Sequence, residues 1–115
     1  MKTLRLETMV SGWFVGNFEP TAFRTDLFEV CYRVHPAGEC WPDHYHKIAT
    51  EINLLVSGRM TIGGVQLRTG DIFILEPGEV ADPVFEEDCA VICVKTPSVK
   101  DDKYVTGSNS WTQNL

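Results

Sequence analysis

Short segments in which apolar and polar residues alternate, separated by glycine and proline, run through the middle of the chain. This period of two is typical of β-strands with one buried face. Residues 27–34 alternate in this way, and we expect the phase of Val30 and Tyr32 to face the core and the phase of Cys31 and Arg33 to face away. The same pattern predicts further strands at residues 43–47, 51–57, 60–62, 65–67, 71–75 and 90–95.

The turns between these segments support an all-β fold. Gly63-Gly64 separates two short strands, and a pair of glycines favours a two-residue hairpin because both tolerate positive φ. No segment has helical periodicity of useful length. Many short strands with frequent turn residues predict a β-sandwich or β-barrel.

The length of 115 residues suits a single domain. We expect residues 1–115 to form it, with a core at about residues 28–95. Residues 1–26 include Trp13 and Phe14 and are too apolar for a free tail, so we expect them to pack on the barrel or on a second subunit. Residues 103–115 are predicted to be a polar tail, which Trp111 would anchor.

Composition excludes several classes of function. A net charge of -6 and a pI near 4.9 argue against nucleic-acid binding, which needs clustered Lys and Arg. No apolar run approaches the roughly 20 residues of a membrane helix, and the first residues do not resemble a secretory signal. We therefore expect a cytoplasmic protein whose four cysteines are free thiols.

The candidate chemistry lies between Gly38 and Gly58. One residue separates His44 from His46, so the two histidines share one face of a strand. Glu51 follows five residues after His46, on the next predicted strand. If the two strands pair, Glu51 lies across from the histidines and the three side chains surround one ion. This set of nitrogen and oxygen ligands suits iron, manganese, nickel, copper or zinc.

The strand that begins at Glu51 has one polar and one aliphatic phase. Asn53 shares the phase of Glu51 and would line the same cavity as a substrate contact. The opposite phase, Ile52, Leu54 and Val56, would point out of the barrel, which indicates a covering segment or a dimer interface.

Two other residues, His35 and Cys40, are of types that can bind a metal. His35 shares the polar phase of its strand, and we expect it to be a solvated surface residue. Cys40 shares the parity of the two histidines, although we expect the cysteines mainly to be small buried residues.

The segment resembles the first sequence motif of the cupin superfamily, in which a glycine, two histidines, a glutamate and a second glycine recur at fixed spacing. All five positions are filled, by Gly38, His44, His46, Glu51 and Gly58. The resemblance covers about residues 28–94 and implies a double-stranded β-helix, or jelly-roll, barrel with a metal site in its mouth, commonly as a homodimer.

The second cupin motif matches only in part. Gly70 and Gly78 have its spacing, but Ala81 occupies the position of the usual last histidine ligand. Three explanations remain open: Asp82 takes over as the ligand through a register change, water fills the position, or the site holds no metal and keeps only a cavity.

The resemblance leaves the activity open, since one fold supports many functions. One hypothesis is a mononuclear metal-dependent enzyme, an isomerase or a dioxygenase, acting on a small polar and carbohydrate-type substrate. Glu51 would double as proton acceptor, and Tyr32, Trp41 and Asn53 would shape the pocket. Alternatives are a cupin that binds or senses a small ligand without turnover, and a metal-free epimerase that uses a histidine and a tyrosine.

Overall fold

A computed structural model describes residues 1–106, and within them the fold is all-β, as predicted. The one helical element in this range is a single turn of 3-10 helix. In chain order the elements are η1 (Leu6–Thr8), β1 (Trp13–Val15), β2 (Glu29–His35), β3 (His44–Tyr45), β4 (Thr50–Ser57), β5 (Arg59–Ile62), β6 (Val65–Arg68), β7 (Ile72–Leu75), β8 (Val84–Phe85), β9 (Cys89–Thr96) and β10 (Tyr104–Val105). None of these is a helix long and apolar enough to cross a membrane.

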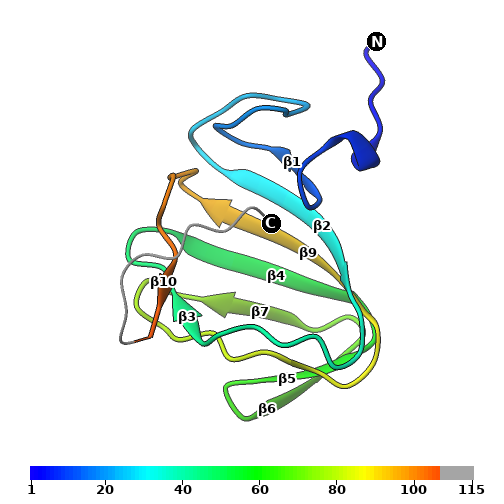
Figure 1. The fold of residues 1–115 in the computed structure, drawn as a ribbon, viewed down its shortest axis with the longest axis vertical. Coiled ribbons are helices and arrows are strands. Elements are labelled where there is room, and N and C mark those ends of the chain that lie inside the picture. Colours follow the sequence, from blue (N-terminus) through cyan, green and yellow to red (C-terminus); the bar gives the residue numbers. More distant parts are fainter. Residues whose placement is uncertain (107–115) are drawn as a thin grey trace.

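The strands form three antiparallel sheets that enclose one interior (Figure 1). The largest has the order β1-β2-β9-β4-β7, and it faces the three-stranded sheet β6-β5-β8 and the pair β10-β3. The hairpin predicted at Gly63-Gly64 is confirmed: both glycines have positive φ, and Ile62 pairs with Val65 across the turn. The strands β1, β8 and β10 were not predicted.

The inner face of the large sheet changes character from one end to the other. Strand register places side chains of β2, β9 and β4 in three successive rows. The rows are Glu29, Lys95 and Glu51; then Cys31, Cys93 and Asn53; then Arg33, Val91 and Leu55. Below the third row lies the apolar core, in which Leu55 and Met60 are fully buried. The polar end of the interior is therefore where chemistry is available.

The predicted orientation of β2 is wrong. Glu29 and Cys31 are buried on the inner face, and Arg33 and His35 line a cavity there, whereas Val34 is 54% exposed. The alternation was recognised correctly but its faces were exchanged, because the inner face of this strand carries the polar end of the interior.

The orientation predicted for β4 is confirmed. Asn53 and Leu55 are buried, whereas Ile52 and Val56 are each 38% exposed on the outer face of the large sheet. Neighbouring strands continue this apolar surface, since Ile52 is in register with Ile74 on one side and with Val94 on the other.

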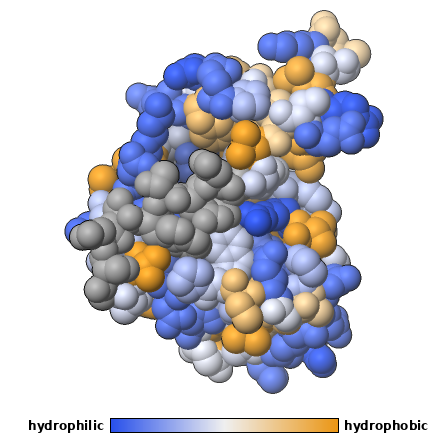
Figure 2. All heavy atoms as spheres, in the orientation of Figure 1, coloured by the Kyte–Doolittle hydropathy of each residue, from blue (hydrophilic) through white to orange (hydrophobic). Residues whose placement is uncertain are grey.

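Both ends of the described chain attach to the barrel, and only the C-terminal end does so differently from the prediction. In the N-terminal segment, β1 pairs with β2, while Phe23 stays 63% exposed, and hydrophobic side chains break the hydrophilic surface of this region in Figure 2. At the other end, Lys103 is buried and β10 pairs with β3, so the predicted polar tail does not begin at residue 103. Trp111 lies outside the described residues.

Candidate metal and ligand site

A cavity of about 100 Å³ lies inside the barrel, where polar side chains of the large sheet meet apolar core side chains such as Met60 and Phe85. It is small enough for a few water molecules or one small ligand. Four residues singled out from the sequence line it together: Trp41, His44, Glu51 and Asn53. Ala81, at the vacant ligand position, lines it as well.

The two motif histidines are buried side by side. His44 begins β3 and is 7% exposed, His46 directly follows β3 and is 5% exposed, and their ring centroids are 5.8 Å apart. Each ring bonds a backbone carbonyl through Nδ1: His44 to Pro42 at 3.1 Å and His46 to Asp102 at 2.6 Å. Since a carbonyl only accepts, Nδ1 of each ring carries the proton, and Nε2 is the ring nitrogen with the chemistry of a metal ligand.

The pKa values agree with neutral imidazoles. Burial, followed by the nearby Lys103 ammonium, lowers the pKa of His44 to about 4. Burial also lowers the pKa of His46, helped by the positive charge of Lys95. Both rings are therefore neutral at pH 7, the state in which imidazole binds a metal.

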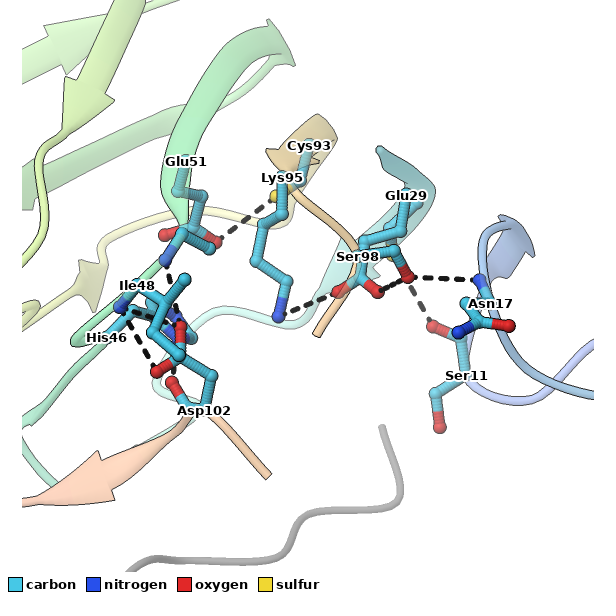
Figure 3. Close-up of polar contacts among 12 residues, drawn as sticks. Ser11, Asn17, Glu29, His46, Ile48, Glu51, Cys93, Lys95, Ser98 and Asp102 are labelled. Carbon is cyan, nitrogen blue, oxygen red and sulfur yellow. Dashed lines mark hydrogen bonds and ion pairs between the residues drawn. The ribbon is translucent and has the colours of Figure 1, made fainter. Parts of the chain in front are cut away.

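Asp102 holds the turn that connects the histidines to Glu51. Its carboxylate accepts hydrogen bonds from the backbone N–H groups of Lys47, Ile48 and Ala49, at 2.9 to 3.2 Å, while its carbonyl binds His46 (Figure 3). This residue lies 56 positions from His46 in the chain. No local pattern in the sequence marks it, and the sequence analysis missed it.

Glu51 is the first residue of β4 whose side chain lies on the inner face of the sheet, and its neighbours on β9 are Cys93 and Lys95. The Cys93 thiol donates a hydrogen bond to Glu51 Oε1 at 3.1 Å. Lys95, opposite Glu51 in register, forms an ion pair with Glu29 at 3.0 Å (Figure 3). Burial alone would lower the pKa of Lys95, but the carboxylates of Glu29 and Glu51 outweigh it and raise that pKa. Burial and the Glu51 charge keep the Cys93 thiol protonated by raising its pKa.

The donor set matches a divalent transition metal, but the side chains are not gathered around one point. The two Nε2 atoms and the Glu51 carboxylate are the nitrogen and oxygen ligands that such ions accept. Within residues 1–106, however, no three His, Cys, Asp or Glu side chains form a ready metal-binding group. A metal at this site would require Glu51 to turn from Cys93 toward the histidines.

Ala81 stands directly opposite His44. The two residues form an isolated antiparallel bridge, with backbone hydrogen bonds of 3.1 Å and 2.6 Å. Any longer side chain at position 81 would therefore enter the cavity next to His44. The methyl group of Ala81 leaves that space to a ligand.

Asp82 does not replace the missing ligand. Its side chain is exposed, and its Oδ1 accepts a hydrogen bond from Gly63 N at 2.7 Å, in the β5–β6 turn. No register change carries it inward, because Ala81 keeps the inward position and successive side chains alternate.

Two other residues lie away from the cavity. Tyr32 contacts a separate shallow pocket with Phe14 and Leu6 of the N-terminal segment, so it does not shape this site. Cys40 is exposed, and its thiol donates to the carbonyl of Gly38.

The expectation that His35 is a solvated surface residue is wrong. Its ring stacks on Phe85 at 4.4 Å, and its Nδ1 bonds the Glu39 carboxylate at 2.5 Å. Glu39 also accepts a hydrogen bond from Trp41 Nε1 at 2.5 Å. Hydrogen bonds from Trp41 and His35 lower the pKa of Glu39, although its partial burial acts the other way. Phe85, His35 and Glu39 together fix the position of the Trp41 ring at the cavity wall.

Two cationic side chains that sequence reasoning did not assign to the site also line the cavity. Arg33 comes from β2 and Lys103 from the residue before β10. Burial, together with the positive charge of Lys95, lowers the pKa of Lys103 to about 7.

Comparison with known proteins shows similarity in fold. No protein-family model matches the chain, and no curated protein sequence matches it significantly. A conserved protein with a double-stranded β-helix domain from Klebsiella pneumoniae is 21% identical, with a TM-score of 0.64 over 73% of this chain and 74% of the other. An RmlC-like cupin from Shewanella frigidimarina is 20% identical, with a TM-score of 0.58 over 67% and 72% of the two chains.

A third solved structure is longer than this chain. The DMSP lyase DddQ from Ruegeria pomeroyi is 19% identical, with a TM-score of 0.68 over 82% of this chain, and the match spans 49% of the lyase. All three similarities agree with the arrangement of sheets described above. The chain therefore has a double-stranded β-helix fold, similar to the folds of these solved structures.

Proposed function

We propose that this chain is a small metal-dependent cupin enzyme, in which His44, His46 and Glu51 hold one divalent transition-metal ion beside a cavity for a small polar substrate. The observation that carries the proposal is the pair of Nδ1-to-carbonyl hydrogen bonds, which fixes the same tautomer in both rings, with the proton on Nδ1 and Nε2 as the basic nitrogen that would bind the metal. A buried histidine that served only the packing would not need this orientation twice, one residue apart.

The ion would be iron, manganese, nickel, copper or zinc, and when bound it would supply Lewis-acid or oxygen-activating chemistry, as in an isomerase or a dioxygenase. The residues of the chain would bind and orient the substrate. Asn53 and Trp41 line the space that the substrate would fill, and Glu51 is the carboxylate placed to take up a proton there. The similar Ruegeria protein is a lyase, so the fold is compatible with catalysis.

A second candidate is a cupin that binds a small ligand without metal or turnover. It is favoured by the absence, within residues 1–106, of three ligands gathered at one point, and by the ion pair network that places Lys95 near Glu51. In this alternative, lysine ammonium groups would take the place of the metal's positive charge.

Metal binding to matched variants tests the proposal. We expect the wild-type protein to retain one ion per chain after incubation with Fe(II), Mn(II), Ni(II) or Zn(II) and gel filtration, measured by elemental analysis. His46→Ala should weaken affinity about a hundredfold or more, since even residues that only support a ligand change affinity by about 10- to 100-fold. His35→Gln, at a histidine outside the triad, should leave metal content unchanged.

The vacant position gives the complementary experiment. Ala81→His places an imidazole opposite His44, so we expect tighter metal binding than in the wild type. A wild-type protein that retains none of the four metals, and gains none from Ala81→His, would rule out the metal site and leave the ligand-binding alternative.

We further propose that the protein is a homodimer that pairs through the outer face of the large sheet. The exposed apolar side chains Ile52, Ile72 and Ile74 lie on adjacent strands, and Ile72 and Ile74 are 67% and 51% exposed. A continuous apolar surface of this kind is typical of an interaction site. We also propose a cytosolic location, because all four cysteines are free thiols, as is usual in a reducing compartment.

A charge placed on this face should separate the two copies. We expect Ile52→Lys to shift the molecular mass in solution from dimer to monomer, because two buried ammonium groups would meet at the symmetric interface. Ile48→Lys changes an isoleucine that is 55% exposed but lies outside the sheet, and it should leave the dimer intact. Sedimentation equilibrium measures both, and a monomeric wild type would contradict the proposal.

A further inference from the structure

Positive charge gathers on one wall of the cavity, in a protein whose net charge is -6. The Arg33 guanidinium carbon lies 4.9 Å from the ring centroid of Trp41, and Lys103 Nζ lies 4.5 Å from the same centroid. All three side chains line the cavity. Two basic side chains, brought to one aromatic ring from β2 and from the residue before β10, form a site with a preference for negative charge.

The ring that carries these cations is held in place. Trp41 Nε1 donates to Glu39, and the same carboxylate oxygen bonds His35 Nδ1. The carboxylate of Glu39 therefore holds the His35 and Trp41 rings together. A ligand that binds here meets a fixed aromatic surface rather than a mobile one.

A neutral donor lines the same cavity. Asn53 is 5% exposed, and its Nδ2 is the one buried side-chain nitrogen or oxygen in residues 1–106 that has no hydrogen-bond partner. A buried amide N–H without a partner costs about 1–3 kcal/mol, so it is expected where a ligand supplies the missing acceptor. Its neighbours across the strands are Cys93 and Phe73, and neither side chain is a strong acceptor.

We propose that the cavity binds a small hydroxy or oxo carboxylic acid, with the carboxylate at Arg33 and Lys103 and the second oxygen at the Asn53 amide. This acid would be the substrate class of the proposed function, and its location in this cavity rests on that function. The contacts of the carboxylate with Arg33 and Lys103 do not involve the metal. The size of the cavity, about 100 Å³, limits the acid to a few heavy atoms. Guanidinium and ammonium groups recognise a carboxylate through charge-assisted hydrogen bonds.

Titration with lactate and lactamide tests the charge requirement on the wild-type protein. The two probes have nearly the same shape, but only lactate carries a negative charge. We expect lactate to shift the indole N–H resonance of Trp41 and to bind about tenfold more tightly than lactamide, or better. Equal binding of the two, or no binding of lactate, would overturn the proposal. Tighter binding of inorganic phosphate than of lactate would overturn the choice of a carboxylate.

Variants locate the two contacts. Arg33→Gln and Lys103→Met should each weaken lactate binding about tenfold or more, while Lys47→Met should not, because Lys47 also lies over an aromatic ring, that of Tyr104, but outside the cavity. Asn53→Ala should abolish the preference for lactate over propionate, which lacks the hydroxyl group. Circular dichroism confirms folding of each variant, and unchanged lactate affinity in folded Arg33→Gln and Lys103→Met overturns the proposal.

Repeating the titration with a chelator and with added Mn(II) separates this inference from the proposed function. Lactate binding that persists in the chelator supports the carboxylate site even if no metal binds at all. Lactate binding that requires Mn(II) and survives Arg33→Gln would place the carboxylate on the metal and overturn the inference.

Discussion

Replacing Asp102 with alanine is expected to lower the free energy of unfolding by about 2–4 kcal/mol, because the change removes the acceptor of one buried and two partly buried backbone N–H groups. The carboxylate is 5% exposed and accepts from the N–H groups of residues 47–49 at distances from 2.9 to 3.2 Å. These residues form the turn between β3 and β4.

The same substitution should impair the candidate metal site. The turn sets the distance between His46 and Glu51, and the backbone of Asp102 holds the His46 ring. We therefore expect the metal affinity of Asp102→Ala to fall at least tenfold, even at temperatures where the protein is folded. Urea denaturation measures stability, and metal titration measures the site.

Asp43→Ala is the matched control. Asp43 is exposed and directly precedes β3, so losing its carboxylate should change the free energy of unfolding by no more than about 0.5 kcal/mol. Equal stability of the two variants would show that Asp102 does not determine the turn.

Asp102 also illustrates which parts of the site can be predicted from sequence. His44, His46 and Glu51 are close in the chain, and strand alternation alone places the two histidines on one face. The contacts of Asp102 and Lys103 depend on β10 returning across the barrel to pair with β3. Nothing in a polar stretch of sequence specifies that return, so the prediction treated it as a tail.

The reversal of β2 has a different physical cause. Hydrophobic alternation predicts which phase is buried only when the interior is apolar. At this end of the barrel the interior is polar, and Glu29 is satisfied there by Lys95 and by the hydroxyl of Ser98, at 3.0 and 2.7 Å. The apolar phase of β2 instead faces outward, where Tyr32 is covered by the N-terminal segment. Polar side chains on the inner face of a strand such as β2 therefore indicate where the candidate site lies.

The β4 phase was predicted correctly because its inner side chains become apolar toward the core. Leu55 is fully buried, and it fixes which way Glu51 and Asn53 point, since residues two apart share a face. Chemistry on β4 was therefore visible in the sequence, whereas the partners on β2 and β9 required the pairing of strands far apart in the chain.

Gly58→Ala is expected to be at least as damaging as the loss of Asp102, although the same substitution at Gly38, the other motif glycine, should be mild. Both glycines have positive φ, +81° at Gly38 and +102° at Gly58, so alanine is strained at either by about 1–2 kcal/mol. Their surroundings differ. A Cβ at Gly38 would meet nothing within 4 Å, but at Gly58 it would lie 2.4 Å from the Asp88 carbonyl oxygen and 2.8 Å from Cys89 Sγ.

The contact at Gly58 involves backbone, which cannot move aside as a flexible side chain would. It also borders the fully buried Cys89 at the start of β9, so relief of the overlap would displace the central strand of the large sheet. We expect a total loss of about 3–5 kcal/mol for Gly58→Ala and about 1–2 kcal/mol for Gly38→Ala, measured by urea denaturation. Similar losses in the two variants would mean that positive φ alone explains both glycines. The turn between β4 and β5 would then have room for a Cβ atom at position 58.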